Sequence, residues 1–241
     1  MLCATFSDMT NLTAIGFDAD DTLWQNEHFF QLTEKSFTEL LADHGDSHHV
    51  SARLLEAERR NLKLYGFGAK GFTLSMMETA LEVTDGTVPQ AVIGKILALG
   101  RAMLDFPIET LPFVHETLEA LSGKYRIILI TKGDLFDQER KLAQSGLGDF
   151  FDAVEIVSDK KAEVYDRIFT RHADGASRAM MIGNSLKSDV IPALEAGAWG
   201  VHVPHELTWE LDRADAPAGH PRFRTLETLK PLLELIEAVM R

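Results

Sequence analysis

Five short runs of apolar residues are the feature that most constrains the fold of this chain. They span residues 13–17, 125–130, 153–157, 179–182 and 200–203. The runs are nearly continuous rather than alternating, which is typical of parallel strands buried on both faces. Helical patterns lie between the later runs, and one of them, residues 135–145, ends at Gly146, a common helix stop. This alternation predicts right-handed crossovers and an α/β fold with a doubly wound parallel sheet.

One long interval interrupts the alternation. Between the first and second apolar runs we find helical patterns and no convincing strand. The patterns cover residues 29–44, 50–64, 73–83 and 89–104. A chain of 241 residues is long enough for one core and a smaller additional unit. We therefore expect a core formed by residues 1–26 and 108–241, with an α-helical domain inserted over residues 27–107.

Composition excludes several classes of partner. The chain has 24 Lys and Arg against 37 Asp and Glu, a formal charge of −13, which repels nucleic acid and anionic lipid. No uncharged apolar stretch reaches the roughly 18 residues of a membrane-spanning helix. The single cysteine, Cys3, cannot form an intramolecular disulfide, which fits a reducing compartment. We expect a cytoplasmic protein that binds neither nucleic acid nor membranes.

An acidic cluster follows the first predicted strand. Asp18, Asp20 and Asp21 place three carboxylates within four residues. In doubly wound sheets, ligands bind beyond the carboxyl ends of the strands, where this cluster is expected. The three charges repel one another, so the arrangement is unfavourable without a nearby cation. A solvated acidic turn is the alternative, whereas a calcium loop is excluded because Leu23 and Phe29 stand where Gly and Glu are required.

Polar residues also follow the next three predicted strands. They are Thr131, Lys132 and Gly133 after the second, Lys160 and Lys161 after the third, and Asn184 and Asp189 after the fourth. A hydroxyl group with glycine-turn amides can hold phosphoryl oxygens, and amide and carboxylate oxygens bind hard cations. Each group alone is also explained by an ordinary turn with a helix cap, such as Asp134. All four groups together fall on one edge of one sheet, which favours a functional site.

With these motifs the chain resembles the haloacid dehalogenase (HAD) superfamily. The matching positions are Asp18, Asp20 and Thr22 of an Asp-x-Asp-x-Thr motif, Thr131, Lys160, and Gly183-Asn184-Ser185 with Asp189. The resemblance covers the chain on both sides of the helical insert, whose position resembles the α-helical caps of the superfamily. It implies a Rossmann-like HAD core with an inserted cap. Asn184 stands where the family usually has Asp, which removes a negative charge and weakens a metal site.

The resemblance also implies a mechanism. Asp18 would be the nucleophile that forms an aspartyl-phosphate, and Asp20 the general acid and base. Mg²⁺ would be held by Asp18, by the backbone carbonyl of Asp20, and by Asn184 or Asp189. Thr131, Lys132 and Gly133 would bind the phosphoryl oxygens. Lys160 would neutralise charge beside Asp18. Lys161 is the alternative, and we favour Lys160 because it precedes Tyr165 by five residues, the spacing that we expect in related members of the superfamily.

We therefore expect a Mg²⁺-dependent phosphatase that hydrolyses the phosphomonoester of a small metabolite. Phosphosugars, phosphoglycolate, nucleoside monophosphates and flavin mononucleotide all remain candidates. A 2-haloacid dehalogenase is the first alternative, and it is disfavoured because dehalogenases resemble this chain at Asp18 but lack the second Asp, here Asp20. A phospho-accepting signalling domain is disfavoured by the helical insert. A non-catalytic scaffold is disfavoured by the intact set of Asp18, Asp20, Thr131 and Lys160.

Residues 66–71 of the insert match the dinucleotide-binding pattern G-x-G-x-x-G. That fingerprint should follow a strand and open a helix, whereas here it follows a charged helical stretch. We therefore interpret it as a loop of the cap. Lys70 would then reach the substrate, with a plain turn between helices as the alternative. Cap helices are also compatible with a homodimer.

Overall fold

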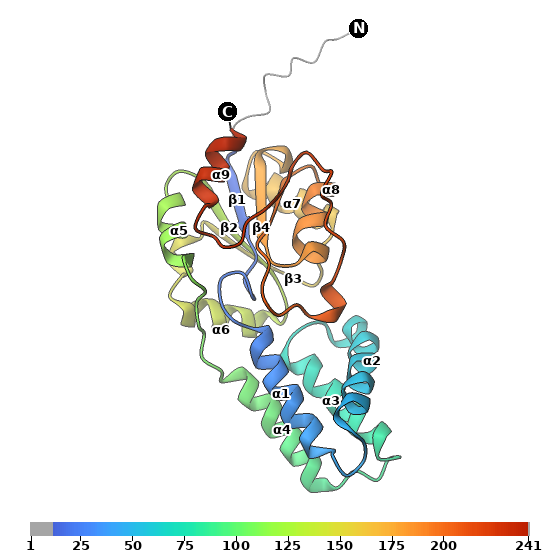
Figure 1. The fold of residues 1–241 in the computed structure, drawn as a ribbon. Coiled ribbons are helices and arrows are strands. Elements are labelled where there is room, and N and C mark those ends of the chain that lie inside the picture. Colours follow the sequence, from blue (N-terminus) through green and yellow to red (C-terminus); the bar gives the residue numbers. More distant parts are fainter. Residues whose placement is uncertain (1–11, 241) are drawn as a thin grey trace. The chain divides into compact units, whose positions relative to one another are not determined.

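The computed structural model describes residues 12–240, and its core is a six-stranded parallel sheet (Figure 1). The strands are β1 (Ala14–Phe17), β2 (Arg126–Lys132), β3 (Ala153–Val157), β4 (Ala179–Gly183), β5 (Trp199–His202) and β6 (Phe223–Thr225). Their spatial order is β3-β2-β1-β4-β5-β6, and every neighbouring pair is parallel. The doubly wound α/β prediction is confirmed. Cys3, the basis of the redox argument, lies outside the described residues.

The order of the strands predicts where on the sheet a ligand would bind. The chain lays down β2 and β3 on one side of β1, and β4, β5 and β6 on the other. The direction of winding therefore reverses between β1 and β4, and at such switch points ligands bind beyond the carboxyl ends of the strands. All residues of β1 and β4 are buried, as the continuous apolar runs predicted.

The sixth strand was missed by the sequence patterns. Phe223–Thr225 has three residues, one of them charged, and pairs only with β5 at the edge of the sheet. Three residues are too few for a continuous apolar run, and a strand at the edge of a sheet pairs with one neighbour only. The opposite edge strand, β3, was found although it is only partly buried.

Helices cover both faces of this sheet. In Figure 1, α5 and α9 lie together on one side, and α7 and α8 on the other. The helices of this part of the chain are α5 (Val114–Leu121), α6 (Leu135–Ser145), α7 (Ala162–His172), α8 (Ile191–Glu195) and α9 (Leu232–Val239). Short turns of 3-10 helix occupy Gly148–Phe150, Ala176–Arg178 and Glu210–Asp212, and a π-helical turn spans Leu186–Val190. The last of these turns carries residues of the site described below.

Four helices lie between β1 and α5, and isolated bridges join Trp24 to Asp20 and to Thr110. The helices are α1 (Glu27–Leu40), α2 (Ser47–Tyr65), α3 (Ala69–Val83) and α4 (Gln90–Leu104). The chain divides into two compact units, which we call the core unit (residues up to Gln25, Glu109–Lys132 and Lys141–Arg241) and the helical unit (Asn26–Ile108 and Gly133–Arg140). The segment 133–140, which includes the first turns of α6, groups with the helical unit. The sequence patterns did not predict this grouping of residues 133–140 with the helical unit.

The helical unit has its own hydrophobic core and a polar network. Buried apolar side chains include Phe37, Leu54 and Met76. Asn61 of α2 donates to Ser75 Oγ of α3 at 3.2 Å and to Glu78 Oε2 at 2.7 Å, so its buried amide is paired. A unit with a separate core is able to fold around its own contacts.

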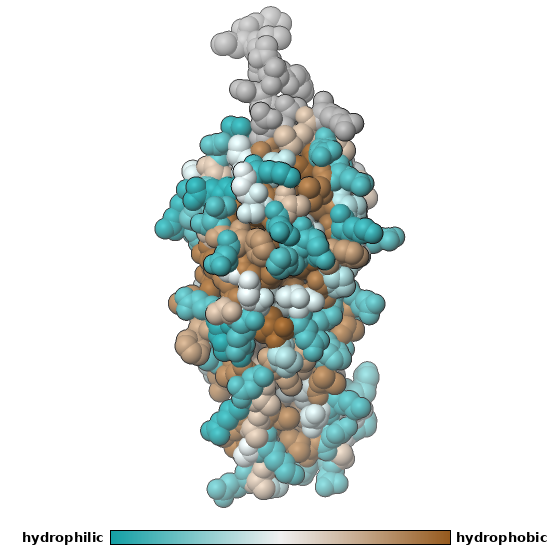
Figure 2. Space-filling view, turned by 90° about the vertical axis from the view of Figure 1, so that its left-hand side faces the viewer, coloured by the Kyte–Doolittle hydropathy of each residue, from teal (hydrophilic) through white to brown (hydrophobic). Residues whose placement is uncertain are grey.

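The surface shows no sign of a membrane-spanning segment. Among residues 12–240, no helix is both long and apolar enough to cross a bilayer. On the face shown in Figure 2, hydrophilic side chains are interspersed with hydrophobic ones. Isolated apolar residues on a surface need no special explanation.

Candidate active site

The loop after β1 separates the three acidic residues that the sequence places together. The Asp18 amide donates to Ile182 O of β4 at 2.9 Å, which continues the pairing of the two central strands. Asp21 adopts a φ of 60°, in the left-handed region that Asp tolerates better than most residues. Its carboxylate lies 3.7 Å from His205 Nδ1. The Asp21 carboxylate is therefore close to His205, and the carboxylates of Asp18 and Asp20 have other partners.

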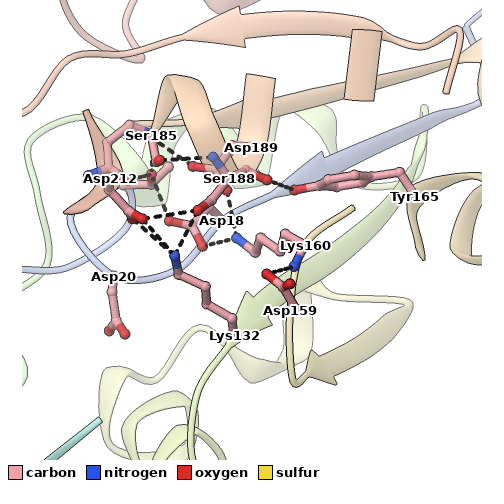
Figure 3. A network of polar contacts seen from close by, with 12 residues as sticks. Asp18, Asp20, Lys132, Asp159, Lys160, Tyr165, Ser185, Ser188, Asp189 and Asp212 are labelled. Atoms are coloured by element: carbon pink, nitrogen blue, oxygen red, sulfur yellow. Dashed lines mark hydrogen bonds and ion pairs between the residues drawn. The ribbon is translucent and has the colours of Figure 1, made fainter. Parts of the chain in front are cut away.

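Asp18 shares a buried lysine with Asp189 (Figure 3). Lys160 Nζ lies 2.5 Å from Asp18 Oδ1 and 2.7 Å from Asp189 Oδ1, and its side chain is only 1% exposed. Lys160 comes from the loop between β3 and α7. Lys161 instead pairs with Asp159, and its side chain is 67% exposed. The structure thus brings Lys160, and not Lys161, to Asp18.

This arrangement has one cation for two carboxylates. Burial, followed by the negative charge of Asp189, raises the pKa of Asp18 to about 7 despite the contact with Lys160. Burial alone would lower the pKa of Lys160, but Asp18 and Asp189 together raise it, so the ammonium group stays charged. The three groups carry a net charge of −1 when all are ionised. A second cation would therefore be stabilised here.

Local backbone structure fixes Asp189. Its Oδ2 accepts from the Ser185 amide at 2.9 Å, while Ser185 Oγ accepts from the Ser188 amide at 3.0 Å. A side chain at Gly183 would place Cβ within 2.3 Å of the Asp189 carboxylate, so only glycine allows this close approach. Ser185 is therefore the cap of the π-helical turn.

The residues at this end of β1 and β4 fit a hard divalent cation. Thr22 Oγ1 lies 3.3 Å from both Asp18 Oδ2 and Asn184 Oδ1, so one hydroxyl joins the two candidate ligands. The Asn184 amide donates back to Thr22 Oγ1 at 3.0 Å. Within residues 12–240, no group of three or more His, Cys, Asp or Glu side chains could hold a metal by itself. The carboxylates of Asp18 and Asp189 and the amide oxygen of Asn184 are all oxygen donors, which suits Mg²⁺ with water completing its shell.

Asp20 has a separate set of partners. Its Oδ1 accepts from Trp24 Nε1 at 2.8 Å and from Lys141 Nζ of α6 at 3.0 Å. Trp24 is fully buried, and its carbonyl accepts from the Asp21 amide at 2.7 Å. The carboxylate two residues after Asp18 is thus held by two donors from different segments.

A third lysine lies beside the site. Lys132 Nζ contacts Ser188 Oγ at 2.7 Å and both carboxylate oxygens of Asp212 at 3.0 Å (Figure 3). Thr131, the preceding residue, is buried in β2. Gly133 follows with a φ of 148°, a backbone conformation that favours glycine, and it is the first residue of the segment Gly133–Arg140 that groups with the helical unit.

Sequence reasoning missed three of these partners. The sequence analysis assigned no role to Trp24, Lys141 resembles any exposed helix lysine, and Asp212 lies near a proline- and alanine-rich loop. Their positions depend on contacts across 4, 121 and 80 residues, respectively. No local pattern carries that information.

Lys70 has an acidic partner within its own unit. Its Nζ lies 2.9 Å from Asp134 Oδ2, and both residues belong to the helical unit. Asp134 also accepts from the Asp137 amide at 3.1 Å, which makes it a cap of α6, as the alternative interpretation predicted. The G-x-G-x-x-G pattern joins α2 to α3 and follows no strand, so it is not a dinucleotide fingerprint.

Comparison with known proteins identifies the class. The family model for haloacid dehalogenase-like hydrolases matches residues 12–197, and the chain belongs to this family. It is therefore an enzyme of the HAD hydrolases rather than a receiver-type signalling domain.

Individual relatives agree with this assignment. The chain is 40% identical to a haloacid dehalogenase-like hydrolase from Xanthomonas campestris, with a TM-score of 0.85 over 96% of this chain and 93% of that one. It is 28% identical to glyceraldehyde 3-phosphate phosphatase from Methanothermobacter thermautotrophicus, over 93% of this chain and all of the relative. It is 26% identical to pyrimidine 5'-nucleotidase YjjG from Escherichia coli, over 76% of this chain and 82% of the relative.

Proposed function

We propose that this enzyme is a Mg²⁺-dependent phosphatase that hydrolyses the phosphomonoester of a small metabolite through an aspartyl-phosphate. The observation that carries the proposal is the second carboxylate, Asp20, held by Trp24 and Lys141 two residues after the buried Asp18. Dehalogenases expel a halide, which needs no proton, so a positioned acid beside the nucleophile supports an oxygen leaving group. The phosphatase and nucleotidase relatives support the same chemistry.

The proposed reaction has two steps. In the first, a carboxylate oxygen of Asp18 attacks phosphorus, the bond to the leaving oxygen breaks, and Asp20 gives its proton to that oxygen. In the second, water attacks the aspartyl-phosphate, Asp20 takes a proton from the water, and the bond between phosphorus and Asp18 breaks. Phosphate leaves, and both Asp residues return to their starting states. Thr131, Lys132 and Gly133 bind the phosphoryl oxygens, and Lys160 stabilises charge beside Asp18.

The metal proposal rests on the oxygen donors described above. Asp18, Asp189, Asn184 and the backbone carbonyl of Asp20 would hold Mg²⁺, which when bound neutralises charge on the phosphoryl group. The shared lysine leaves Asp18 and Asp189 with an uncompensated negative charge, which supports this assignment. The amide of Asn184 contributes no charge of its own, so we expect weaker binding than at a site with a third carboxylate.

The remaining parts of the proposal concern partners. The helical unit acts as a cap and selects the substrate, with Lys70 as a candidate contact. The charge of −13 supports a small metabolite rather than nucleic acid or a membrane as the partner. A cytoplasmic location and a homodimer formed through the cap belong to the same proposal.

A substrate panel with and without metal tests this function. The panel contains sugar phosphates, phosphoglycolate, nucleoside monophosphates, flavin mononucleotide and 2-chloropropionate, with phosphate and chloride release as readouts. We expect phosphate release from at least one ester, a loss of about 100-fold or more after dialysis against EDTA, and recovery on adding Mg²⁺. Chloride release, or undiminished hydrolysis after chelation, would contradict the proposal.

A further inference from the structure

Two donors converge on one oxygen of the Asp20 carboxyl group. Trp24 Nε1 and Lys141 Nζ both donate to Oδ1, at 2.8 and 3.0 Å. A carboxylate oxygen offers two lone pairs, and two donors occupy both of them. A proton on Oδ1 would compete with one of these donors.

The environment makes the contact with Lys141 stronger than a surface ion pair. The Lys141 side chain is 12% exposed and that of Asp20 is 24% exposed. Surface ion pairs contribute little because water screens them and the side chains lose freedom. Here both partners are mostly buried, and Trp24, the second donor, is fully buried on an independent segment. The position of Oδ1 is thus fixed from two directions.

We propose that Lys141 is a positioning residue for the acid–base step, which rests on the proposed phosphatase function. As Asp20 gives up its proton, its carboxyl group gains negative charge, and the hydrogen bond from the ammonium group strengthens. An interaction that is stronger in the transition state than in the ground state accelerates the step. Lys141 thereby stabilises the carboxylate that forms, and with Trp24 it fixes the orientation of the Asp20 side chain.

This role predicts a dependence on the leaving group. Release of an alcohol from an alkyl phosphate needs the proton from Asp20, whereas p-nitrophenol is acidic enough to leave without one. The experiment measures release of the leaving group in the first turnover with Mg²⁺ present, because this quantity reports only the first chemical step. The substrates are p-nitrophenyl phosphate and the best alkyl phosphate of the panel.

For Lys141→Met we expect first-turnover release from the alkyl ester to fall about 100-fold or more, and release of p-nitrophenol to fall less than about tenfold. KM should change little for both esters, and Lys141→Arg should restore most of the alkyl rate. Trp24→Phe should have the same kind of effect as Lys141→Met, with a larger fall in the rate for the alkyl ester than for p-nitrophenyl phosphate. Lys124→Met, which replaces an exposed lysine of the core unit, serves as the matched control and should resemble the wild type.

The outcomes separate this inference from the proposed function. If the wild type hydrolyses neither ester, the phosphatase proposal is wrong. If the wild type is active but Lys141→Met slows both esters equally, Lys141 has only a structural role and the inference is overturned. A rise in KM for both esters without a change in first-turnover rate would show instead that Lys141 binds the phosphoryl group. Both of the last two results contradict a positioning role.

Discussion

Asp18→Asn is expected to abolish phosphate-ester hydrolysis, with a loss on the order of 10⁴-fold or more. The amide has nearly the shape of the carboxylate but cannot attack phosphorus, so the covalent route is closed. The fold should survive because Lys160 keeps its 2.7 Å contact with Asp189. Phosphate release from the best substrate of the panel, measured with Mg²⁺, checks this prediction.

The matched control is the protein itself under the same conditions, with circular dichroism and thermal unfolding recorded for both forms. Equal phosphate release by wild type and variant would remove Asp18 from the mechanism. If the variant does not fold, the role of Asp18 is tested instead by trapping the aspartyl-phosphate on the folded Asp20→Asn protein. We expect a native spectrum, so that the loss of rate reports the missing nucleophile.

The second large effect is expected for Lys160→Met. This change removes the one cation shared by Asp18 and Asp189, and breaking a buried ion pair costs about 3–5 kcal/mol of unfolding free energy. One of the two carboxylates must then bind a proton in the folded state. Its folded pKa lies above its unfolded value, so stability is greatest at low pH and is lost as pH rises.

Three measurements check this prediction. The variant should unfold more easily than the wild type, with a larger deficit at pH 8 than at pH 5. Mg²⁺ should raise the Tm of the variant more than that of the wild type, because the metal would supply the missing positive charge. Activity should fall about 100-fold or more.

Lys161→Met provides the control next in the chain. Its side chain is exposed and pairs with Asp159, so the change should alter stability by less than about 0.5 kcal/mol. If Lys161→Met were the damaging variant and Lys160→Met were tolerated, the assignment of the buried lysine would be wrong.

Much of the fold was predictable because its signals are local. Continuous apolar runs mark strands buried on both faces, and β1 and β4 are buried at every position. The edge strand β6 was missed because its three residues, with Arg224 in the middle, form no continuous apolar run. The grouping of residues 133–140 with the helical unit was also unpredictable, because it depends on packing between segments distant in sequence.

The site shows the same division between local and distant signals. Asp18, Lys160 and Asp189 were identifiable because each follows a strand, and parallel strands bring their carboxyl ends to one edge. Lys141 and Asp212 were not, because their sequence neighbours give no sign of the carboxylate and lysine that they meet. The sequence motifs therefore predicted the groups proposed to act on the phosphoryl group, and the structure adds the residues that hold some of them.

The central claim is that Asp18 forms a covalent aspartyl-phosphate, and trapping this species tests it most directly. Asp20→Asn protein is mixed with Mg²⁺ and p-nitrophenyl phosphate, quenched in acid, digested and analysed by peptide mass spectrometry. Without the base for the second step, we expect one phosphoryl group on the peptide that contains Asp18, and its loss on treatment with hydroxylamine. If the wild type turns over while neither protein yields this adduct, or if the phosphoryl group is found on another residue, the account is contradicted.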